Sequence, residues 1–327
     1  MGGLKEAFYR VLAILYRYSE EVAVIDYPDR IEKRSLDVAV RIGGGRVLLL
    51  KIADDIVDVP KSEVNELKGL GAAMGLPAGI IATKRRGREL APYVAYERQG
   101  LPVVSPESLE EYLRSGGAGI YAYQSRDSIR VKIDSEALKR AREALGLSLG
   151  DVASFLGVSR KMVYQYEKGM ADPTLDKAEK LASLLGEKVI ESWDPFKEPP
   201  RPPASHPPFD EEGEEALAME LARRGLKVFH AKKTAADITA SAPPEPRIVI
   251  AYQHRREPLP KLVDRVDNIV RLSRVAESKP IAVVEGREEE AELSSIKGVT
   301  LIRRSRRVSL DELLGEEATD NREAGGR

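Results

Sequence analysis

The chain has 327 residues, 42% of them apolar and 32% charged, which is enough to bury globular cores in two or three domains. It contains no cysteine, so disulfides, thiolate metal sites and cysteine nucleophiles are excluded. The formal net charge of −1 gives no overall basic signal for nucleic acid, and no apolar run reaches the roughly 18 residues that span a bilayer, so we expect a cytoplasmic protein without a membrane segment.

The histidines and the charged clusters are few. His206, His230 and His254 lie in a linker and in two strand regions, and isolated histidines of this kind are more often structural than metal-binding. We therefore expect no metal and no cofactor. Basic runs at 84–88 (KRRGR) and 303–307 (RRSRR) indicate solvated surface, with contact to phosphate as the alternative.

Residues 1–117 are predicted to form an α/β domain. The glycines at 43–45 lie between two β-rich runs and predict a tight hairpin, because glycine enters positive φ without steric cost. A phosphate-binding glycine loop is the alternative, but no helix begins directly after it. The periodicity predicts helices at 4–18, 61–74, 88–98 and 106–113, and strands at 36–42, 46–52, 78–83 and 102–104.

The first hairpin raises the question of a nuclease site. Counting outward from the glycine loop pairs Ala39 with Leu49 and places Asp37 opposite Lys51 on one face of the sheet. An Asp followed by a strand that ends in x-x-Lys, in this order of elements, resembles the PD-(D/E)xK nuclease fold. The resemblance implies a Mg²⁺ ion held by two carboxylates, with the lysine assisting attack.

The second carboxylate position of that pattern is occupied by Leu49, whose apolar side chain cannot bind a hard cation. Asp54 and Asp55 follow the lysine and could substitute only if the strand were bulged. We therefore expect a degenerate, non-catalytic domain in which Asp37 and Lys51 form a cross-strand ion pair worth at most about 1 kcal/mol.

A predicted β-hairpin connector at 118–133 leads to an all-helical block at 134–192. Ser148 is placed to cap a helix, and Asp151 three residues later completes a capping box. A glycine ends this helix, and Ser159 caps a second one. Two short helices joined by a three-residue turn that contains glycine form a helix-turn-helix.

The second of these helices buries Val163 and Tyr166 and turns arginine, lysine and glutamine outward, the residue types that contact base edges and phosphate. The block resembles the lambda-repressor-like, Cro-type (XRE) helix-turn-helix domain. The matching residues are Asp151-Val152-Ala153, Leu156-Gly157-Val158-Ser159-Arg160, Val163, Tyr166-Glu167, Gly169, Pro173, Leu175 and Leu181-Ala182-Leu184.

The architecture as a whole resembles a group of archaeal HTH-type transcriptional regulators. The resemblance implies these DNA-contacting residues: Ser148, Ser159, Arg160, Lys161, Tyr164, Gln165 and Lys168. Leu149 stands where that family often has glutamine, so a phosphate contact is not implied there. Acidic and basic residues are about balanced in the block, which predicts modest affinity or help from elsewhere.

A proline-rich linker at 193–213 is the clearest domain boundary. Such a segment extends by about 3 Å per residue, and we expect it to hold the flanking domains some tens of ångströms apart. Residues 214–315 are predicted to be a second α/β domain, and residues 316–327 a disordered tail. The expected helices are 214–224, 260–276, 288–294 and 309–314, and the expected strands include 226–230, 281–284 and 300–302.

The second α/β domain repeats the order of the first, which indicates a degenerate internal duplication. The alignment matches Asp237 to Asp37 and Arg247 to Arg46, with one extra residue in the turn, and puts Ile250 and Tyr252 at the positions of Leu49 and Lys51.

The expected fold is α/β plus all-α, with two degenerate restriction-endonuclease-like α/β domains flanking a lambda-repressor-like helix-turn-helix domain. The expected function is that of a non-enzymatic transcriptional regulator that binds double-stranded DNA sequence-specifically, with the second helix in the major groove. A homodimer is expected, with half-sites about 34 Å apart, and the α/β domains would dimerise, contact backbone or sense an unknown effector. The alternatives are a Mg²⁺-dependent, structure-directed nuclease and a scaffold that binds protein.

Overall fold

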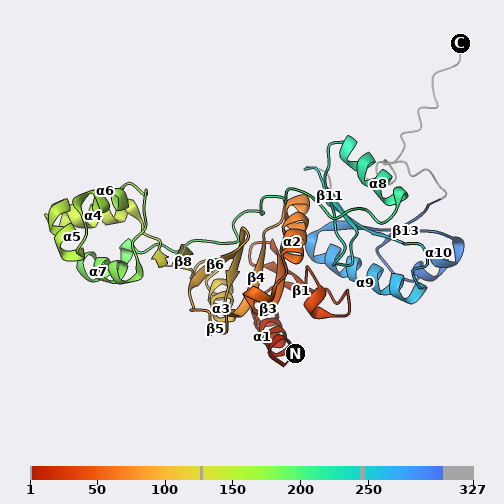
Figure 1. The fold of residues 1–327 in the computed structure, drawn as a ribbon, viewed down its shortest axis with the longest axis horizontal. Coiled ribbons are helices and arrows are strands. Elements are labelled where there is room, and N and C mark those ends of the chain that lie inside the picture. Colours follow the sequence, from red (N-terminus) through yellow and green to blue (C-terminus); the bar gives the residue numbers. More distant parts are fainter. Residues whose placement is uncertain (1, 126–127, 244–246, 305–327) are drawn as a thin grey trace, which may run out of the picture.

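The computed structural model describes residues 2–125, 128–243 and 247–304. Figure 1 shows a helical bundle at one end of an elongated molecule and two α/β units that lie side by side in the rest of it. Within these ranges no helix is both long and apolar enough to cross a membrane. The helix expected at 309–314, the tail at 316–327 and most of the basic run at 303–307 fall outside the described residues.

The first α/β unit is built on a sheet whose strands run in the order β1-β2-β3-β4-β7-β6-β8-β9, with β5 paired to β4. Helices α1 and α3 pack on one face of the sheet and α2 on the other. The elements up to α3 are α1 (Gly2–Tyr18), β1 (Glu21–Val24), β2 (Val38–Ile42), β3 (Arg46–Asp55), α2 (Lys61–Met74), β4 (Ala78–Arg85), β5 (Arg88–Glu89), β6 (Val94–Arg98), β7 (Leu101–Val104) and α3 (Pro106–Arg114), with 3₁₀ turns at Ile31–Lys33 and Ile56–Asp58.

The helix predicted at 88–98 is wrong, because this segment forms β5 and β6. The left-handed turns at Gly87 and Tyr93 break any helix. Val94 and Ala95 are buried, since β6 pairs antiparallel with β7 and parallel with β8. Two-residue turns with positive φ, Arg86-Gly87 and Gln99-Gly100, fold this segment back on β4 and β7 and override the local helical pattern.

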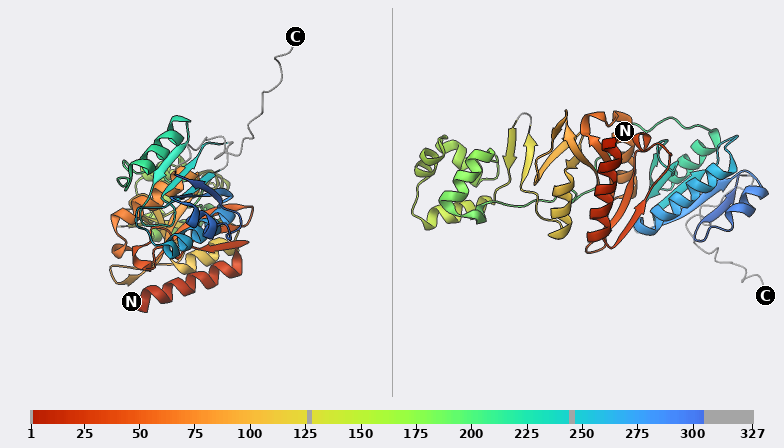
Figure 2. Two further views of the ribbon diagram at one scale, coloured as in Figure 1. Left: turned by 90° about the vertical axis from the view of Figure 1, so that its right-hand side faces the viewer. Right: turned by 90° about the horizontal axis from the view of Figure 1, so that it is seen from below.

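The hairpin β8 (Ala122–Ser125) and β9 (Ser128–Val131) extends the first sheet and carries the bundle. Figure 2 shows, from a second side, the bundle standing off the α/β body on this hairpin. The chain leaves and returns side by side, since isolated bridges join Arg130 to Thr174 and Ile133 to Ile190. The bundle consists of α4 (Ser135–Ala144), α5 (Leu149–Leu156), α6 (Arg160–Glu167) and α7 (Leu175–Leu185), followed by a 3₁₀ turn at Glu187–Val189.

The second α/β unit has the sheet order β10-β11-β12-β13-β14, antiparallel in its first two pairings and parallel in its last two. The strands β1-β2-β3-β4-β7 of the first unit have the same order and the same directions. The elements are α8 (Glu212–Arg223), β10 (Lys227–His230), β11 (Ile238–Ser241), β12 (Arg247–Tyr252), α9 (Leu259–Ala276), β13 (Ser278–Val284), α10 (Arg287–Leu293) and β14 (Thr300–Arg303).

Hydrogen bonds fix the correspondence between the two units and correct the sequence alignment. Asp37 N–H donates to Leu50 O, and Asp237 N–H donates to Ile250 O. The position of Lys51 is therefore that of Ala251, one residue before Tyr252. The second hairpin therefore has no extra residue relative to the first. The sequence alignment matched identical residues, whereas the register is defined by the backbone hydrogen bonds.

The composition of the linker predicts that it holds the two α/β units apart. This prediction is wrong, because the units pack directly on each other. Helix α2 lies on β10 and β11, while α9 lies on β1 and β2, so each unit covers the edge hairpin of the other. Arg41 donates to Val275 O (2.8 Å) at the end of α9, and Arg247 donates to Met74 O (2.6 Å) at the end of α2. One apolar cluster runs through both units.

The linker runs along the first unit because its side chains bind there. Phe196 is fully buried in the core beside Tyr112, and Asp194 accepts hydrogen bonds from Arg46 (2.6 Å) and Tyr112 (2.8 Å). Burying an aromatic ring is worth about 1.5–3 kcal/mol, which outweighs the tendency of prolines to stay extended in solvent. The helical bundle is thus an insertion, and the α/β units on either side of it in sequence are neighbours in space.

Gly69 in the middle of α2 is required by this packing. A Cβ atom there would lie 2.1 Å from Cε2 of Phe229 in β10. We expect Gly69→Ala to lower the free energy of unfolding by about 1–2 kcal/mol, because overpacking costs about 1–3 kcal/mol while the gain in helix propensity returns at most about 1. Urea denaturation measures it; the control Gly43→Ala meets open space, and equal stability of both variants would contradict the assignment.

Candidate nucleic-acid interface

Helices α5 and α6 form the turn that the sequence predicts. Ser148 Oγ accepts from Asp151 N–H (3.2 Å), and the Asp151 carboxylate accepts from Ser148 N–H (2.7 Å), so the capping box is complete. The hydrogen bonds from Ser148 hold the pKa of Asp151 below its usual value. Gly157 ends α5 in the left-handed region (φ 68°), and Ser159 Oγ caps α6 by accepting from Met162 N–H (3.2 Å).

The expected DNA-contacting residues lie at different depths on this face. Ser148, Ser159, Arg160, Lys161, Tyr164 and Lys168 are exposed, and Gln165 is half-buried. Val163 and Tyr166 are buried in the bundle core, as the pattern predicts. Lys168 Nζ lies 5.8 Å from the centre of the Tyr164 ring, and the Arg160 guanidinium lies against Gly150 at the start of α5. Cations and a polar-tipped ring thus share one surface.

The bundle is fixed to the β8–β9 hairpin by Asp172, a residue that the sequence did not single out. Its carboxylate accepts hydrogen bonds from Tyr123 (2.9 Å) and Lys132 (2.9 Å), and its carbonyl accepts from Arg130 (2.8 Å). Burial and the hydrogen bond to Asp172 raise the pKa of Tyr123 to about 12. These contacts hold α6 in a defined orientation relative to the α/β body.

The nuclease-like position of the first unit is buried. Lys51 Nζ donates to Arg34 O (2.6 Å) and lies 3.7 Å from Asp37 Oδ2. Asp37 is fully buried, and burial raises the pKa of its carboxyl group. The value of about 1 kcal/mol assumes a surface pair, whereas this pair is buried, where removal of one partner leaves an uncompensated charge.

A second carboxylate does reach Lys51, but from helix α2 and not from β3. Glu63 Oε2 lies 3.3 Å from Lys51 Nζ, and Glu63 Oε1 lies 3.4 Å from Nζ of Lys233, which belongs to the second unit. Ser35 N–H also donates to Lys233 O (2.8 Å). The second unit therefore covers this carboxylate and supplies it with a further cation. A count along β3 alone could not find Glu63.

The other candidate carboxylates are engaged elsewhere. Strand β3 pairs with β4 in one register from Leu49 to Asp55, so it has no bulge there. Hydrogen bonds from Thr83 (2.6 Å) and from Lys84 (3.2 Å) hold the pKa of Asp54 below its usual value. Although burial opposes it, the pKa of Asp55 is also lowered, because Gly87 N–H donates to its carboxylate (2.6 Å).

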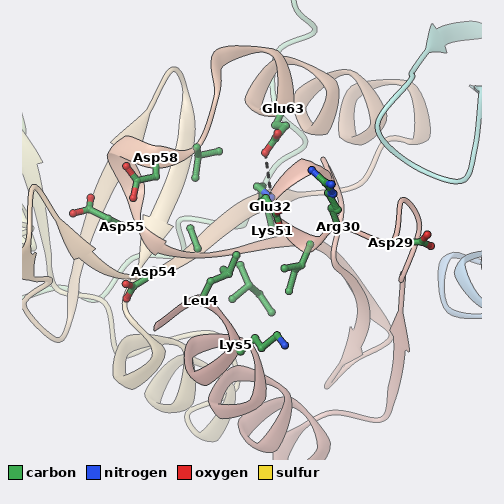
Figure 3. A pocket seen from close by; sticks show the side chains of 14 residues that line it. Leu4, Lys5, Asp29, Arg30, Glu32, Lys51, Asp54, Asp55, Asp58 and Glu63 are labelled. Atoms are coloured by element: carbon green, nitrogen blue, oxygen red, sulfur yellow. Dashed lines mark ion pairs between the residues drawn. The ribbon is translucent and has the colours of Figure 1, made fainter. Parts of the chain in front are cut away.

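A pocket of about 630 Å³ opens beside these groups. Figure 3 shows Asp54, Asp55 and Asp58 on one side of it and the ion pair of Lys51 and Glu63 on another. Asp37 does not line the pocket, and Leu49, on the same face of β3 as Lys51, is buried in the core cluster that includes α2. Six carboxylates and three cations line the pocket, and Lys51 at its edge is only 3% exposed.

The second unit keeps the aspartate and replaces the lysine. Tyr252 N–H donates to Asp237 Oδ2 (2.6 Å), as Ile52 N–H donates to Asp37 Oδ2 (2.7 Å). With Ala251 in the lysine position, the cation is Arg265 of α9, which pairs with both Asp237 and Glu257. Burial alone would raise the pKa of Asp237, but Arg265 and His254 hold it below its usual value.

A helix-turn-helix on a nuclease-like body defines a class of DNA-binding proteins. Residues 138–191 match the family model described as "Helix-turn-helix", and residues 5–117 match one described as "PD-(D/E)XK superfamily domain". Both resemblances drawn from the sequence are confirmed. No solved structure matches the chain.

Relatives along the whole chain give the family. A "Putative HTH-type transcriptional regulatory protein" of Aeropyrum pernix is 35% identical over 326 residues, 98% of each chain. Proteins of the same description from Saccharolobus islandicus (31% over 257 residues) and Saccharolobus solfataricus (30% over 262) cover 77% of this chain and 79% of their own. The chain belongs to this archaeal family of HTH-type transcriptional regulatory proteins.

Proposed function

We propose that the protein is a non-enzymatic transcriptional regulator that reads double-stranded DNA with α6 in the major groove. The observation that carries the proposal is the exposed row of Arg160, Lys161, Tyr164 and Lys168 on a capped helix at the far end of the molecule. Arginine and lysine donate to guanine edges, and lysine neutralises phosphate. A protein of this function acts on chromosomal DNA, so we place it in the cytoplasm.

The site residues keep separate roles in this proposal. Arg160, Lys161 and Gln165 face bases, Tyr164 contributes to the same surface, and Lys168 contacts backbone phosphate. Ser148 and Ser159 use their hydroxyl oxygens as helix caps, so their exposed N-terminal turns would approach phosphate through backbone N–H groups. Phe155, which is 48% exposed on α5, adds an apolar element that the sequence reading did not include.

The proposed assembly on DNA is a homodimer. The described part of each chain holds one helix-turn-helix, and a two-fold operator with half-sites about 34 Å apart needs two. Within the chain, α2 and α9 already cover the edge hairpins of the two α/β units. A second chain would therefore bind through other surfaces, and light scattering of the protein with and without its operator measures the stoichiometry.

We take the second unit to be a degenerate restriction-endonuclease-like repeat of the first. The matching strand order and the matching hydrogen bonds at Asp37 and Asp237 support this. The two together form a body that orients the bundle. The pocket beside Lys51 gives an unknown effector a place to bind.

A Mg²⁺-dependent nuclease is the second candidate, favoured by the family match at residues 5–117 and by Lys51 and Glu63 at the edge of a pocket. It requires Asp37 and Glu63 to release their lysines and to bind metal together. The burial of Asp37 and the contact from Lys233 weigh against it.

One experiment separates the two candidates. The full chain is incubated with randomised duplex DNA at moderate salt, with and without Mg²⁺, and retained fragments and cleaved ends are scored together. Enrichment of a two-fold-symmetric site with intact ends supports the regulator. Mg²⁺-dependent ends that disappear in Asp37→Ala would replace it with the nuclease. Failure to retain any DNA, at any salt concentration, would favour a protein-binding scaffold.

A further inference from the structure

The chain's three histidines, expected to be isolated, approach one corner of the second unit. The rings of His206 and His230 have centroids 6.2 Å apart. His230 ends β10 and lies beside Glu214 of α8, and His254 follows β12 and lies 3.3 Å from Asp237. Segments far apart in sequence thus bring imidazole and carboxylate groups together. The expectation of isolated histidines is wrong because β10 and β12 end on the same side of the sheet, and the linker passes beside the end of β10.

Two of these groups face each other without a hydrogen bond. His230 Nε2 lies 3.0 Å from Glu214 Oε1, both residues are at least 99% buried, and neither atom has a hydrogen-bond partner. The other ring nitrogen, Nδ1, lies 3.0 Å from the carbonyl oxygen of Pro207. A proton on Nδ1 donates to that carbonyl and leaves the lone pair of Nε2 directed at a carboxylate. Metal-binding histidines are commonly oriented in this way.

Asp210 completes a set of three. One carboxylate oxygen each from Asp210 and Glu214 and the His230 nitrogen lie within 4.8 Å of one another. Ligands about 2.0–2.2 Å from a shared metal are about 3–3.5 Å apart at angles between 90° and 110°, which the 3.0 Å separation of His230 and Glu214 already meets. Asp210 is exposed, so an ion could enter from solvent.

The charges around the set favour a cation at Glu214. The neighbouring carboxylate of Asp237 is already paired with Arg265. Glu214 has no lysine or arginine partner among the described ion pairs, and its other oxygen accepts only from Asp210 N–H (3.1 Å). Lys232 pairs with Oδ1 of Asp210. A metal ion would therefore bind the other carboxylate oxygen of Asp210, or Lys232 would have to move aside.

We propose that Asp210, Glu214 and His230 bind a divalent transition-metal ion, with water as a further ligand on the open side. One imidazole and two carboxylates suit Zn²⁺, whereas Mg²⁺ prefers oxygen ligands and keeps its water shell. The site lies where the linker enters the second unit: Asp210 precedes α8, and Glu214 and His230 belong to the unit itself. The ion therefore fastens the incoming segment to the sheet.

The test is direct binding to the full chain. Protein stripped with a chelator is titrated with Zn²⁺ in an isothermal calorimeter, and the metal retained after gel filtration is counted. We expect one Zn²⁺ per chain, unaffected by a hundredfold excess of Mg²⁺. Glu214→Gln and His230→Gln should each weaken binding by at least tenfold, because each replaces a carboxylate or an imidazole with a neutral amide, which is a weaker ligand for Zn²⁺.

Matched variants act as controls. Glu220→Gln changes a half-buried residue of the same helix, whose side chain is 45% exposed, and His206→Gln changes the exposed histidine nearby; both should bind as the parent chain does. If the Glu214 or His230 variant fails to fold by circular dichroism, the Co²⁺-loaded parent chain supplies the readout: nitrogen and oxygen ligation gives a visible absorption band that Zn²⁺ removes. Absence of stoichiometric Zn²⁺ on the parent chain, or equal binding by Glu214→Gln, overturns the proposal and leaves a histidine–carboxylate ion pair.

Discussion

The double variant Arg160→Ala, Lys161→Ala is expected to lose sequence-specific DNA binding, with the apparent dissociation constant rising by about 10²–10⁴-fold. The reason is that each good side-chain contact to a base contributes about 1–3 kcal/mol of discrimination, and both residues stand exposed at the start of α6. Fluorescence anisotropy on the selected operator measures the loss. The slope of log K against log salt should also become shallower.

The control for this variant is matched in charge. Lys139→Ala, Arg140→Ala removes the same two charges from exposed neighbouring positions of α4, outside the proposed contact surface. Its affinity should change by less than threefold, and both variants should unfold at the temperature of the parent chain. Equal losses in the two variants would show that only overall charge matters, and α6 would not be the reading helix.

Replacing Lys51 with methionine is expected to lower the free energy of unfolding by about 3–5 kcal/mol. The lysine lies between the buried carboxylates of Asp37 and Glu63, and removing one partner of a buried charge set leaves the others uncompensated. Lys233 still reaches Glu63, so the larger loss falls on Asp37. Urea denaturation at pH 7 measures the change, and Lys61→Met, at an exposed position of α2, should change it by less than about 0.5 kcal/mol.

The same variant should respond to pH in a defined direction. Burial already raises the pKa of Asp37 in the parent chain, and loss of Lys51 raises it further. A carboxyl group whose folded-state pKa exceeds its unfolded value binds more protons when folded, so stability falls as pH rises. The deficit of Lys51→Met should therefore shrink between pH 7 and pH 5. A deficit that stays constant over this range would mean that Asp37 is compensated by another group.

The helix-turn-helix could be predicted closely because its signals are local. Caps at Ser148 and Ser159, a left-handed glycine at Gly157 and the buried Val163 and Tyr166 act within a few residues of one another. The backbone hydrogen bonds of such a unit join residues within the unit. Its outward-facing residues follow from helical periodicity alone, although the half-burial of Gln165 does not.

The register of the first hairpin is another local property, because the three-glycine turn fixes which residues of β2 and β3 pair. The helix predicted at 88–98 is wrong because the turns Arg86-Gly87 and Gln99-Gly100, with positive φ, make hairpins of this segment with β4 and β7. The sequence alignment of the second hairpin is wrong by one residue, because it matches identical residues, whereas the pairing of strands follows the backbone hydrogen bonds.

The sequence by itself determined the repeated order of α/β elements, the helix-turn-helix and the absence of a carboxylate at Leu49. Only the tertiary structure decided that the two α/β units pack on each other, that Glu63 and Lys233 surround Lys51, and that His230 meets Glu214 and Asp210. The physical reason is that these contacts join residues far apart in the chain. Burial of apolar faces selects them, and no local spacing encodes which faces will meet.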